Sequence, residues 1–177
     1  MRELSLFSGA GGGLLATKHL LGWTTIGYVE IDEYCQRVIR QRIEDGYLDN
    51  APIFGDINTF ISDGSAELYR GITDLITAGF PCQPFSVAGK QAGEDDPRNM
   101  WPATRDTIRI IRPRNIFIEN VPGLLSHAYI WRILSDITEM GLDSRWGIIS
   151  AADVGAPHLR KRWWCVAHAT SKRLSEP

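Results

Sequence analysis

Apolar and polar positions along the chain follow two different periods, which predicts strands separated by helices. Short runs of apolar or β-branched residues are typical of buried strands, and such runs occupy residues 4–8, 24–30, 52–54, 73–78 and 115–120. Apolar residues recur every three or four positions in the intervening segments, which predicts helices at 14–21, 33–44, 101–111 and 129–140. Two further strands are expected at 146–152 and 163–169, joined without a helix.

This order of elements predicts an α/β fold. Regular alternation of strand and helix is typical of a mostly parallel, doubly wound, Rossmann-like sheet. The last two strands lack a crossover helix, so one antiparallel strand is expected near the C-terminus. The 177 residues are 44% hydrophobic, which is enough for one domain with a substantial core. We expect that domain at residues 1–170 and a short tail at 171–177.

The net charge of -2 predicts no general attraction to nucleic acid, but the basic residues are unevenly placed. Residues 98–114 hold five arginines and one acid, and residues 158–173 hold five lysines and arginines and no acid. Either cluster could hold phosphates. From charge alone, a solvated helix face is the simpler interpretation.

The three cysteines, Cys35, Cys82 and Cys165, form no C-x-x-C pair. This pattern argues against a disulfide framework or a zinc site and for a reducing compartment. The sequence contains no run of about 18 apolar residues that would span a membrane, and its N-terminus lacks the pattern of a signal peptide. The histidines show no ligand-like spacing. We therefore expect a cytoplasmic protein without a metal ion.

Glycine-rich and acidic segments follow the first three predicted strands, where ligands bind in sheets of this kind. The segment "LFSGAGGG" contains glycines that let a backbone approach a ligand, namely Gly9, Gly11 and Gly12. It suits NAD, FAD or S-adenosylmethionine as well as a plain tight turn. Glu30 could hold ribose hydroxyls or cap a helix. Asp56 could accept from an adenine amine, with Ile57 against the ring, or form an Asx-turn.

A long segment rich in proline and glycine follows the fourth predicted strand and contains "GFPCQPFS". Segments of such length inside a compact domain are usually functional. Pro81 and Pro84 stiffen the backbone on both sides of Cys82. A lone cysteine is more often buried and inert, and it acts as a nucleophile only in an electropositive, partly exposed setting.

Taken in order, these motifs resemble those of the carbon-5 cytosine-specific DNA methyltransferase family. The segments "LSLFSGAGGG", "YVEID" and "GDI" resemble its first three motifs, "GFPCQPFS" its catalytic fourth and "IFIENVPGLL" its sixth. The arginine-bearing "DDPRNMWPATRDTIRIIRP" resembles the stretch between the fourth and sixth motifs, and "VGAPHLRKRWW" resembles the eighth motif. The resemblance extends over residues 3–168.

The resemblance implies a DNA (cytosine-5)-methyltransferase that uses S-adenosylmethionine. Cys82 would add to carbon 6 of a flipped-out cytosine, so that carbon 5 can take the methyl group. Glu119 would hold a proton at ring nitrogen 3, which requires burial that favours the protonated carboxyl. Arg162 would contact the carbonyl oxygen of the base, with Arg160 in support. The two arginines are spaced i and i+2 on an extended segment and should face the same side.

The resemblance also implies a cofactor pocket at Phe7, Ser8, Gly9, Gly11, Gly12, Glu30, Ile31, Asp56, Ile57 and Pro84. The residues expected to contact DNA are Gln83, Ser86, Arg98 and His158. His158 departs from the family pattern, which most often has glutamine two positions before the first arginine. Nearby aromatic residues are interpreted as core, namely Phe85, Trp101, Trp163 and Trp164.

Members of the family continue beyond the eighth motif with a target-recognition domain and a last motif whose helix packs against the cofactor site. This sequence contains neither, so we expect a truncated or split enzyme, or one partnered by a second polypeptide. Other interpretations are a silent S-adenosylmethionine- or DNA-binding module and an RNA cytosine methyltransferase. A nicotinamide-dependent oxidoreductase is more distant, because it would not explain "PCQP" together with "ENV".

Overall fold

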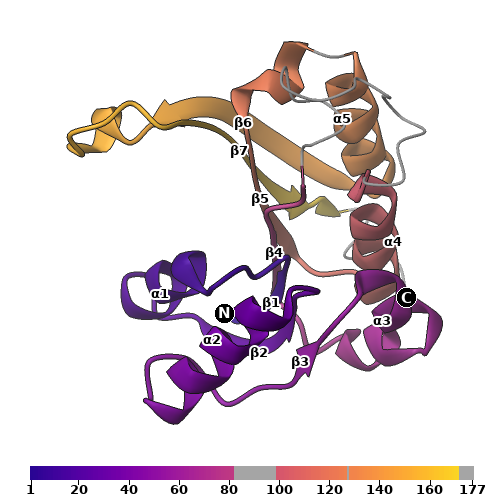
Figure 1. Cartoon of the computed structure of the whole chain (residues 1–177). Helices are drawn as coiled ribbons and strands as arrows, with labels where there is room; N and C mark the ends of the chain where they lie inside the picture. Colours follow the sequence, from indigo (N-terminus) through magenta and orange to yellow (C-terminus); the bar gives the residue numbers. More distant parts are fainter. Residues whose placement is uncertain (82–98, 127, 172–177) are drawn as a thin grey trace.

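The computed structural model describes residues 1–81, 99–126 and 128–171, which form a central sheet with helices on both faces (Figure 1). The strands are β1 (Arg2–Leu6), β2 (Thr24–Val29), β3 (Ile53–Phe54), β4 (Leu75–Ala78), β5 (Asn115–Asn120), β6 (Leu142–Ser150) and β7 (Lys161–Ala169). The α-helices are α1 (Gly12–His19), α2 (Glu33–Glu44), α3 (Ile57–Ser62), α4 (Trp101–Ile111) and α5 (Tyr129–Glu139). Short 3₁₀ helices are η1 (Ser65–Tyr69), η4 (Pro122–Ser126) and η5 (Ala152–Val154).

The strands lie in the order β3-β2-β1-β4-β5-β7-β6. The first five strands of the chain pair in parallel, and the strand order changes direction between β1 and β4, which is the switch point of a doubly wound sheet. β7 runs antiparallel to both of its neighbours, β5 and β6. The predicted α/β fold, mostly parallel with one antiparallel strand near the C-terminus, is confirmed.

Each face of the sheet is covered by its own helices (Figure 1). The helices α3, α4 and α5 cover one face, where the main core includes Leu4, Ile76 and Ile116 from the strands. The helices α1 and α2 lie on the other face, where Leu14 and Ile39 pack with Tyr28 in a second cluster. Successive side chains of a strand point to opposite faces, so each strand contributes to both layers.

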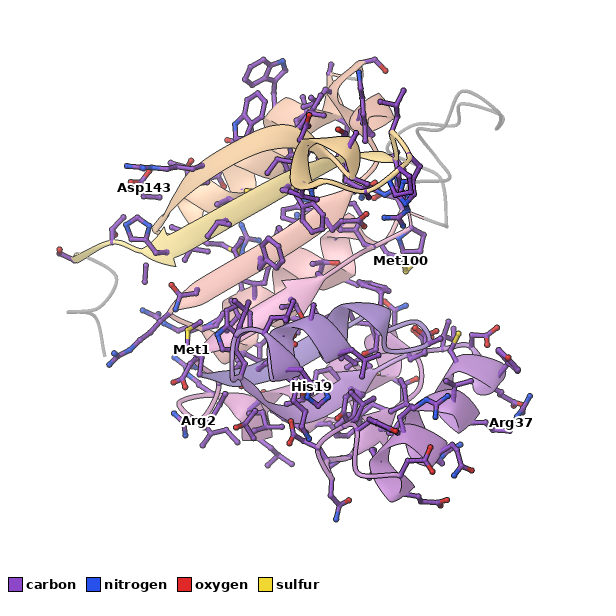
Figure 2. The ribbon with its side chains drawn as sticks, turned by 90° about the vertical axis from the view of Figure 1, so that its left-hand side faces the viewer. Met1, Arg2, His19, Arg37, Met100 and Asp143 are labelled. Carbon is purple, nitrogen blue, oxygen red and sulfur yellow. The ribbon has the colours of Figure 1, made fainter. Side chains whose placement is uncertain are left out.

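The α1 face of the sheet is open over β5 and β7. Figure 2 looks onto this face: α1, which carries His19, lies in front of the lower strands, and no α-helix of the described residues lies in front of β5 and β7. Phe117 stacks on Trp164 there, with ring centroids 5.3 Å apart and rings 9° from parallel. Val166, opposite Phe117 in the ladder, is 52% exposed. A sheet face of this apolar character normally packs against another layer.

Local sequence signals explain several element boundaries. Asp32 caps α2, as expected, by accepting the backbone N–H of Cys35 at 2.8 Å. Gly27 marks a close approach, because a Cβ there would lie 2.5 Å from the hydroxyl of Tyr69. The helix α3 was not predicted, since its six residues are too few to show a helical period. No helix in the described part of the chain is long and apolar enough to cross a membrane.

Candidate active site

Residues with functional chemistry gather at the edge of the sheet where the parallel strands end. Phe7 and Glu30 directly follow β1 and β2. Asp56 and Gly79 come after β3 and β4, and Glu119 is the second-last residue of β5. Parallel strands share one direction, so their carboxyl ends meet at the same edge, which is where ligands bind in doubly wound sheets.

The glycine-rich loop after β1 is fastened to the end of β2. The N–H of Gly9 donates to Glu30 Oε2 at 2.6 Å, and the N–H of Ser8 donates to the carbonyl of Val29 at 3.2 Å. Phe7 and Gly9 both have φ of 55°. Glycine adopts this left-handed conformation freely, whereas at Phe7 it stores backbone strain of the kind that clusters at ligand sites. A Cβ at Gly9 would meet no atom of the described residues within 4 Å, so those residues leave the loop open on that side.

Glu30 organises this corner through both of its carboxylate oxygens. Oε2 accepts from Gly9, and Oε1 accepts the N–H of Asp32 at 2.8 Å. A carboxylate has about four lone-pair sites, so Glu30 retains acceptors for ribose hydroxyls although it is only 8% exposed. The neighbouring Ile31 is 68% exposed. The corner therefore fits the sugar of a nucleoside cofactor, and this role stays a prediction.

Asp56 and Ile57 both have structural roles. Asp56 is the N-cap of α3, and its Oδ1 accepts the N–H of Asn58 at 2.9 Å. This is the local turn-type contact that was the alternative expectation for Asp56. Ile57 is 3% exposed and belongs to the main core. Contacts of these two residues with an adenine ring stay predictions.

Glu119 and Arg162 form a close ion pair at the carboxyl edge of the open sheet face. Arg162 Nε lies 2.6 Å from Glu119 Oε1. Glu119 lies opposite Trp164 in the β5–β7 ladder, so Arg162, two residues earlier, points to the same face. A Cβ at Gly79 would sit 3.5 Å from Glu119 Oε2, an ordinary contact distance, so Gly79 lies directly beside this carboxyl. The expected burial of Glu119 is not found: within the described residues its side chain is 31% exposed.

A cleft of about 520 Å³ connects this ion pair to the glycine-rich loop. Ser8, Glu119 and Arg160 line its end at the carboxyl edge of the sheet. The cleft continues between α1 and the sheet to Thr77 and Phe117. A ligand in the cleft could therefore contact the loop, Glu119 and Arg160 at once.

The floor of the cleft contains a buried carboxyl that the sequence analysis missed. Glu3 on β1 is 1% exposed and accepts from the hydroxyl of Thr17 at 2.6 Å and from that of Thr77 at 2.7 Å. Burial raises the pKa of Glu3, and the two hydroxyl donors partly oppose that rise. Glu3 thereby ties α1 to the sheet. The available signal was an acid inside an apolar strand, but the predicted strand began one residue later.

The basic residues singled out in the sequence lie in two different environments, the exposed connection before β7 and the helix α4. His158 and Arg160 are exposed in the connection before β7, where Arg160 reaches the cleft. On α4, Arg105 and Arg109 form ion pairs with acids of α4 and α5. The α4 arginines therefore join helices and do not line the cleft, and Arg105, at 20% exposure, does not lie on the solvated face that was the simpler interpretation.

Several expected site residues lie outside the described residues, namely Cys82, Gln83, Pro84, Ser86 and Arg98, and so does Phe85, which was expected in the core. Of the other cysteines, Cys165 is buried on β7, where burial raises its pKa to about 12. Such a thiol is an unreactive core residue. Across residues 1–81, 99–126 and 128–171, no group of three or more histidines, cysteines or acids is placed to bind a metal ion.

The tryptophans expected in the core divide as well. Trp101 and Trp163 are 0% exposed, which confirms the expectation for these two residues. The expectation is wrong for Trp164, which alternates with Trp163 along β7 and lines the cleft on the opposite face. Two adjacent tryptophans in one strand cannot both point into the same layer.

The sheet order, the reversed β7 and the loop held by an acid after β2 define the Rossmann-like fold of S-adenosylmethionine-dependent methyltransferases. A solved structure of DNMT2 from Spodoptera frugiperda shares this fold, with a TM-score of 0.76, 23% identity, and coverage of 99% of this chain and 51% of that one. The chain belongs to the C-5 cytosine-specific DNA methylase family, whose model matches residues 1–176.

Two relatives illustrate the relationship within the family. The type II methyltransferase M.NgoMIV of Neisseria gonorrhoeae is 34% identical over 168 residues, which is 93% of this chain and 51% of the relative. The type II methyltransferase M.AquIA of Picosynechococcus sp. is 31% identical over 191 residues, which covers 98% of this chain and 74% of the relative. The chain thus spans about half the length of the Neisseria protein.

Proposed function

We propose that the chain is the catalytic part of a DNA (cytosine-5)-methyltransferase, which transfers a methyl group from S-adenosylmethionine to carbon 5 of a flipped-out cytosine. The main support is the Glu119–Arg162 ion pair beside a cleft that it shares with the glycine-rich loop. A carboxyl and a guanidinium together complement the Watson–Crick edge of cytosine, which offers an amine, a ring nitrogen and a carbonyl oxygen.

Glu30 and the glycine-rich loop would hold S-adenosylmethionine. The acceptor sites that Glu30 retains suit a pair of ribose hydroxyls, and its contacts with Gly9 and Asp32 fix the carboxylate in place. Among the residues that the structure describes, no atom lies within 4 Å of a Cβ placed at Gly12 or Gly13, so a ligand could approach the backbone closely there. When bound, this cofactor supplies an electrophilic methyl group.

Cys82 supplies the nucleophile in this proposal. Its thiolate would form a bond to carbon 6 of the ring, and the electron pair of the 5,6 double bond would make carbon 5 nucleophilic. Carbon 5 would then bond to the methyl group, whose bond to the sulfonium sulfur breaks, so that the cofactor leaves as a neutral thioether. A base removes the carbon-5 proton, the double bond re-forms, and the bond between sulfur and carbon 6 breaks. Arg160 lines the cleft, and its positive charge would favour the thiolate of a cysteine held beside it.

Glu119 and Arg162 would stabilise the ring while charge develops on it. Glu119 would hold a proton at ring nitrogen 3, and Arg162 would donate to the carbonyl oxygen. Arg162 uses Nε for Glu119 and Nη1 for the carbonyl of Lys161. A guanidinium has five N–H donors, so these two contacts do not exhaust its capacity.

Recognition of the DNA sequence would come from a further region or a second polypeptide. The chain spans about half the length of the Neisseria relative, and major-groove reading needs side chains delivered to base edges. The open face at Phe117, Trp164 and Val166 offers an apolar surface on which such a region can pack. Contact there would also cover one side of the cleft.

The direct test is transfer of tritiated methyl groups from S-adenosylmethionine to DNA or RNA by the wild-type chain and by Cys82→Ser. Each is assayed alone and with the separately expressed C-terminal half of the Neisseria relative. We expect 5-methylcytosine in DNA, and a loss of at least about a thousandfold in Cys82→Ser, as for other deleted nucleophiles. Calorimetry should show an affinity for S-adenosylmethionine within about twofold of wild type in that variant.

The outcomes separate the parts of the proposal. Label in RNA alone, or label that persists in Cys82→Ser, would contradict the proposed reaction. A chain that binds S-adenosylmethionine but labels neither acceptor in any combination would be a binding module instead. Efficient labelling of DNA by the chain alone would refute only the need for a further region.

A further inference from the structure

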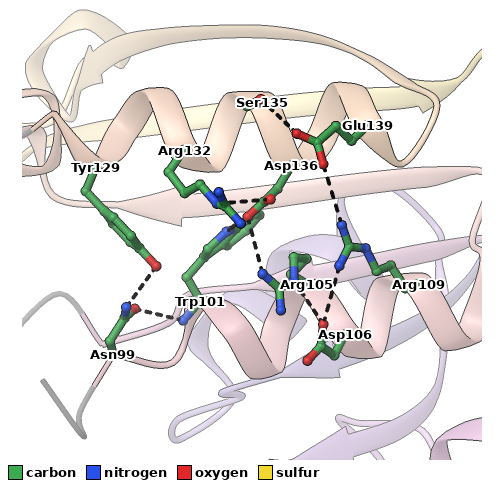
Figure 3. Close-up of polar contacts among 10 residues, drawn as sticks. All are labelled: Asn99, Trp101, Arg105, Asp106, Arg109, Tyr129, Arg132, Ser135, Asp136 and Glu139. Atoms are coloured by element: carbon green, nitrogen blue, oxygen red, sulfur yellow. Dashed lines mark hydrogen bonds and ion pairs between the residues drawn. The ribbon is translucent and has the colours of Figure 1, made fainter. Parts of the chain in front are cut away.

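A fully buried carboxylate joins α4 to α5 (Figure 3). Asp136 on α5 is 0% exposed, and its Oδ2 accepts the indole N–H of Trp101 at 2.8 Å. Arg105 Nη1 lies 3.8 Å from the same oxygen, and Arg132 Nε lies 3.3 Å from Oδ1. Oδ1 has no hydrogen bond to any of the described residues. The indole is therefore the one hydrogen-bond donor to this carboxylate within the described part of the chain.

A second contact fixes the same end of α4. The side-chain amide of Asn99 donates to the hydroxyl of Tyr129 on α5 at 2.8 Å. Asn99 Oδ1 also accepts the backbone N–H of Trp101 at 3.2 Å. Residues 99–101 are thus held at both the side chain and the backbone, directly after the segment that carries Cys82.

The chain that leads into that segment rests on the same indole. The rings of Phe80 and Trp101 lie with centroids 5.6 Å apart, and both side chains are at most 3% exposed. The side-chain amide of Asn120 donates to the carbonyl of Phe80 at 3.1 Å, and Asn120 Oδ1 accepts the N–H of Val121 at 2.8 Å. Trp101 therefore touches the residue two positions before Cys82 as well as the residues after the segment.

We propose that Asp136 is a positioning residue for Cys82, acting through Trp101 and Phe80; the inference rests on the proposed role of Cys82 as nucleophile. Asp136 fixes the rotation of the indole, and the indole supports the backbone that leads to Cys82. Because Cys82 follows Phe80 by two residues, the position of Phe80 limits where the thiol can lie. Placement of a reacting group within a fraction of an ångström strongly affects a catalysed rate.

The two arginine pairs allow Asp136 to be buried between the helices, and the hydrogen bond to Trp101 adds a directional constraint that packing does not require. Burial of a carboxylate is costly unless it is paired, and apolar side chains of similar volume often join helices at least as well. A hydrogen bond is directional, so it selects one orientation of the indole where an apolar contact would allow several. The same two helices also carry an ordinary exposed pair, Arg109 and Glu139, at 3.9 Å.

The test measures alkylation of each cysteine by iodoacetamide, followed by peptide mass spectrometry. At about pH 9.5 roughly nine-tenths of an ordinary thiol is ionised, so the rate reports access more than pKa. We expect Asp136→Leu to change the Cys82 rate by at least about fivefold, because the backbone before Cys82 loses the support of a fixed indole. Asp136→Asn keeps an acceptor for the indole and should stay within about twofold of wild type. Trp101→Phe keeps the ring against Phe80 but loses the N–H, and it should behave like Asp136→Leu.

Two internal controls make the result decisive. Glu139→Gln removes the exposed pair on the same helices and should leave the Cys82 rate unchanged. Cys165 is buried on β7, so its labelling in the same sample reports global opening. An unchanged Cys82 rate in Asp136→Leu and Trp101→Phe, or an equal change at Cys165, would overturn the proposal. Alkylation needs no methyl transfer, so an inactive chain with the expected Cys82 response would refute only the proposed reaction.

Discussion

Arg162 Nε lies 2.6 Å from Glu119 Oε1, although 43 residues separate the two along the chain. The reversal of β7 makes this contact possible. Because β7 runs against β5, the residues that begin β7 lie beside the residues that end β5. A parallel strand in that position would bring its last residues to this edge instead. Glu119 and Arg162 therefore meet at the carboxyl edge as residues of two adjacent strands.

Glu119→Gln should reduce methyl transfer by about 100-fold or more, because it removes the group proposed to hold a proton at the ring. The assay is tritium transfer to DNA under the conditions in which the wild type is active. Affinity for S-adenosylmethionine should be unchanged by calorimetry. Glu67→Gln, an exposed acid on η1, is the matched control and should retain full activity. Equal activity of Glu119→Gln and wild type would remove Glu119 from the mechanism.

Glu30→Ala should weaken S-adenosylmethionine binding by about 10-fold to 100-fold, since hydrogen bonds to charged groups contribute about 1.5–3 kcal/mol. The change removes the acceptor for ribose and also frees the N–H of Gly9. Titration calorimetry measures the affinity. Glu33→Gln is the control, because Glu33 follows closely in sequence but its side chain is 88% exposed. A similar loss of affinity in both variants would point to general charge and not to the contacts of Glu30.

Glu3→Gln should become more stable relative to wild type as the pH rises. Burial raises the pKa of Glu3 in the folded chain above its ordinary value of 4.5. The contribution of Glu3 to stability is therefore fully present below that value and is lost as the pH rises through the raised pKa. Glutamine does not titrate and can still contact the hydroxyls of Thr17 and Thr77.

Urea unfolding of Glu3→Gln and wild type between about pH 4 and pH 8 measures this difference in the free energy of unfolding. The advantage of the variant should grow with pH across that window. Glu67→Gln, at an exposed residue, is measured in parallel and reports the effect of removing a surface carboxyl. A Glu3→Gln difference that stays constant or shrinks as the pH rises would contradict the assigned effect of burial.

Val166→Glu should leave the isolated chain intact but reduce its activation by a recognition region. Val166 is 52% exposed on the open face beside Phe117, so the isolated fold should tolerate a charge there within about 0.5 kcal/mol. A charge in an interface remains costly unless it is paired. Leu68→Glu on η1, at a residue that is 75% exposed, is the control. Methyl transfer with and without the C-terminal half of the Neisseria relative distinguishes the two variants.

Local signals were sufficient for much of the fold. The bounds of α2, α4 and β5 agree with the sequence prediction, because Asp32 gives a clear cap and the apolar periods are regular. β6 begins at Leu142 instead of 146. Its first residues, "LDSR", are mostly polar because β6 is an edge strand, and such a segment resembles a turn.

The candidate site could be predicted only in part, because its contacts join residues that lie far apart in the sequence. The order of strands placed Glu30 and Glu119 at one edge, and that much follows from topology. The partners of these carboxyls do not, because Gly9 and Asp32 engage Glu30 through backbone N–H groups that every residue has. The Asp136–Trp101 contact joins residues 35 positions apart, and a buried acid in a helix has no distinct pattern in a single sequence.

The stability of this chain would depend on whether another polypeptide covers the stacked rings of Phe117 and Trp164. A polypeptide that binds the open face of the folded chain, and not the unfolded chain, raises the free energy of unfolding in proportion to the logarithm of its concentration. The melting temperature would then depend on how much of that polypeptide is present. The amount of this polypeptide would therefore determine how long the folded chain persists, as well as which DNA it methylates.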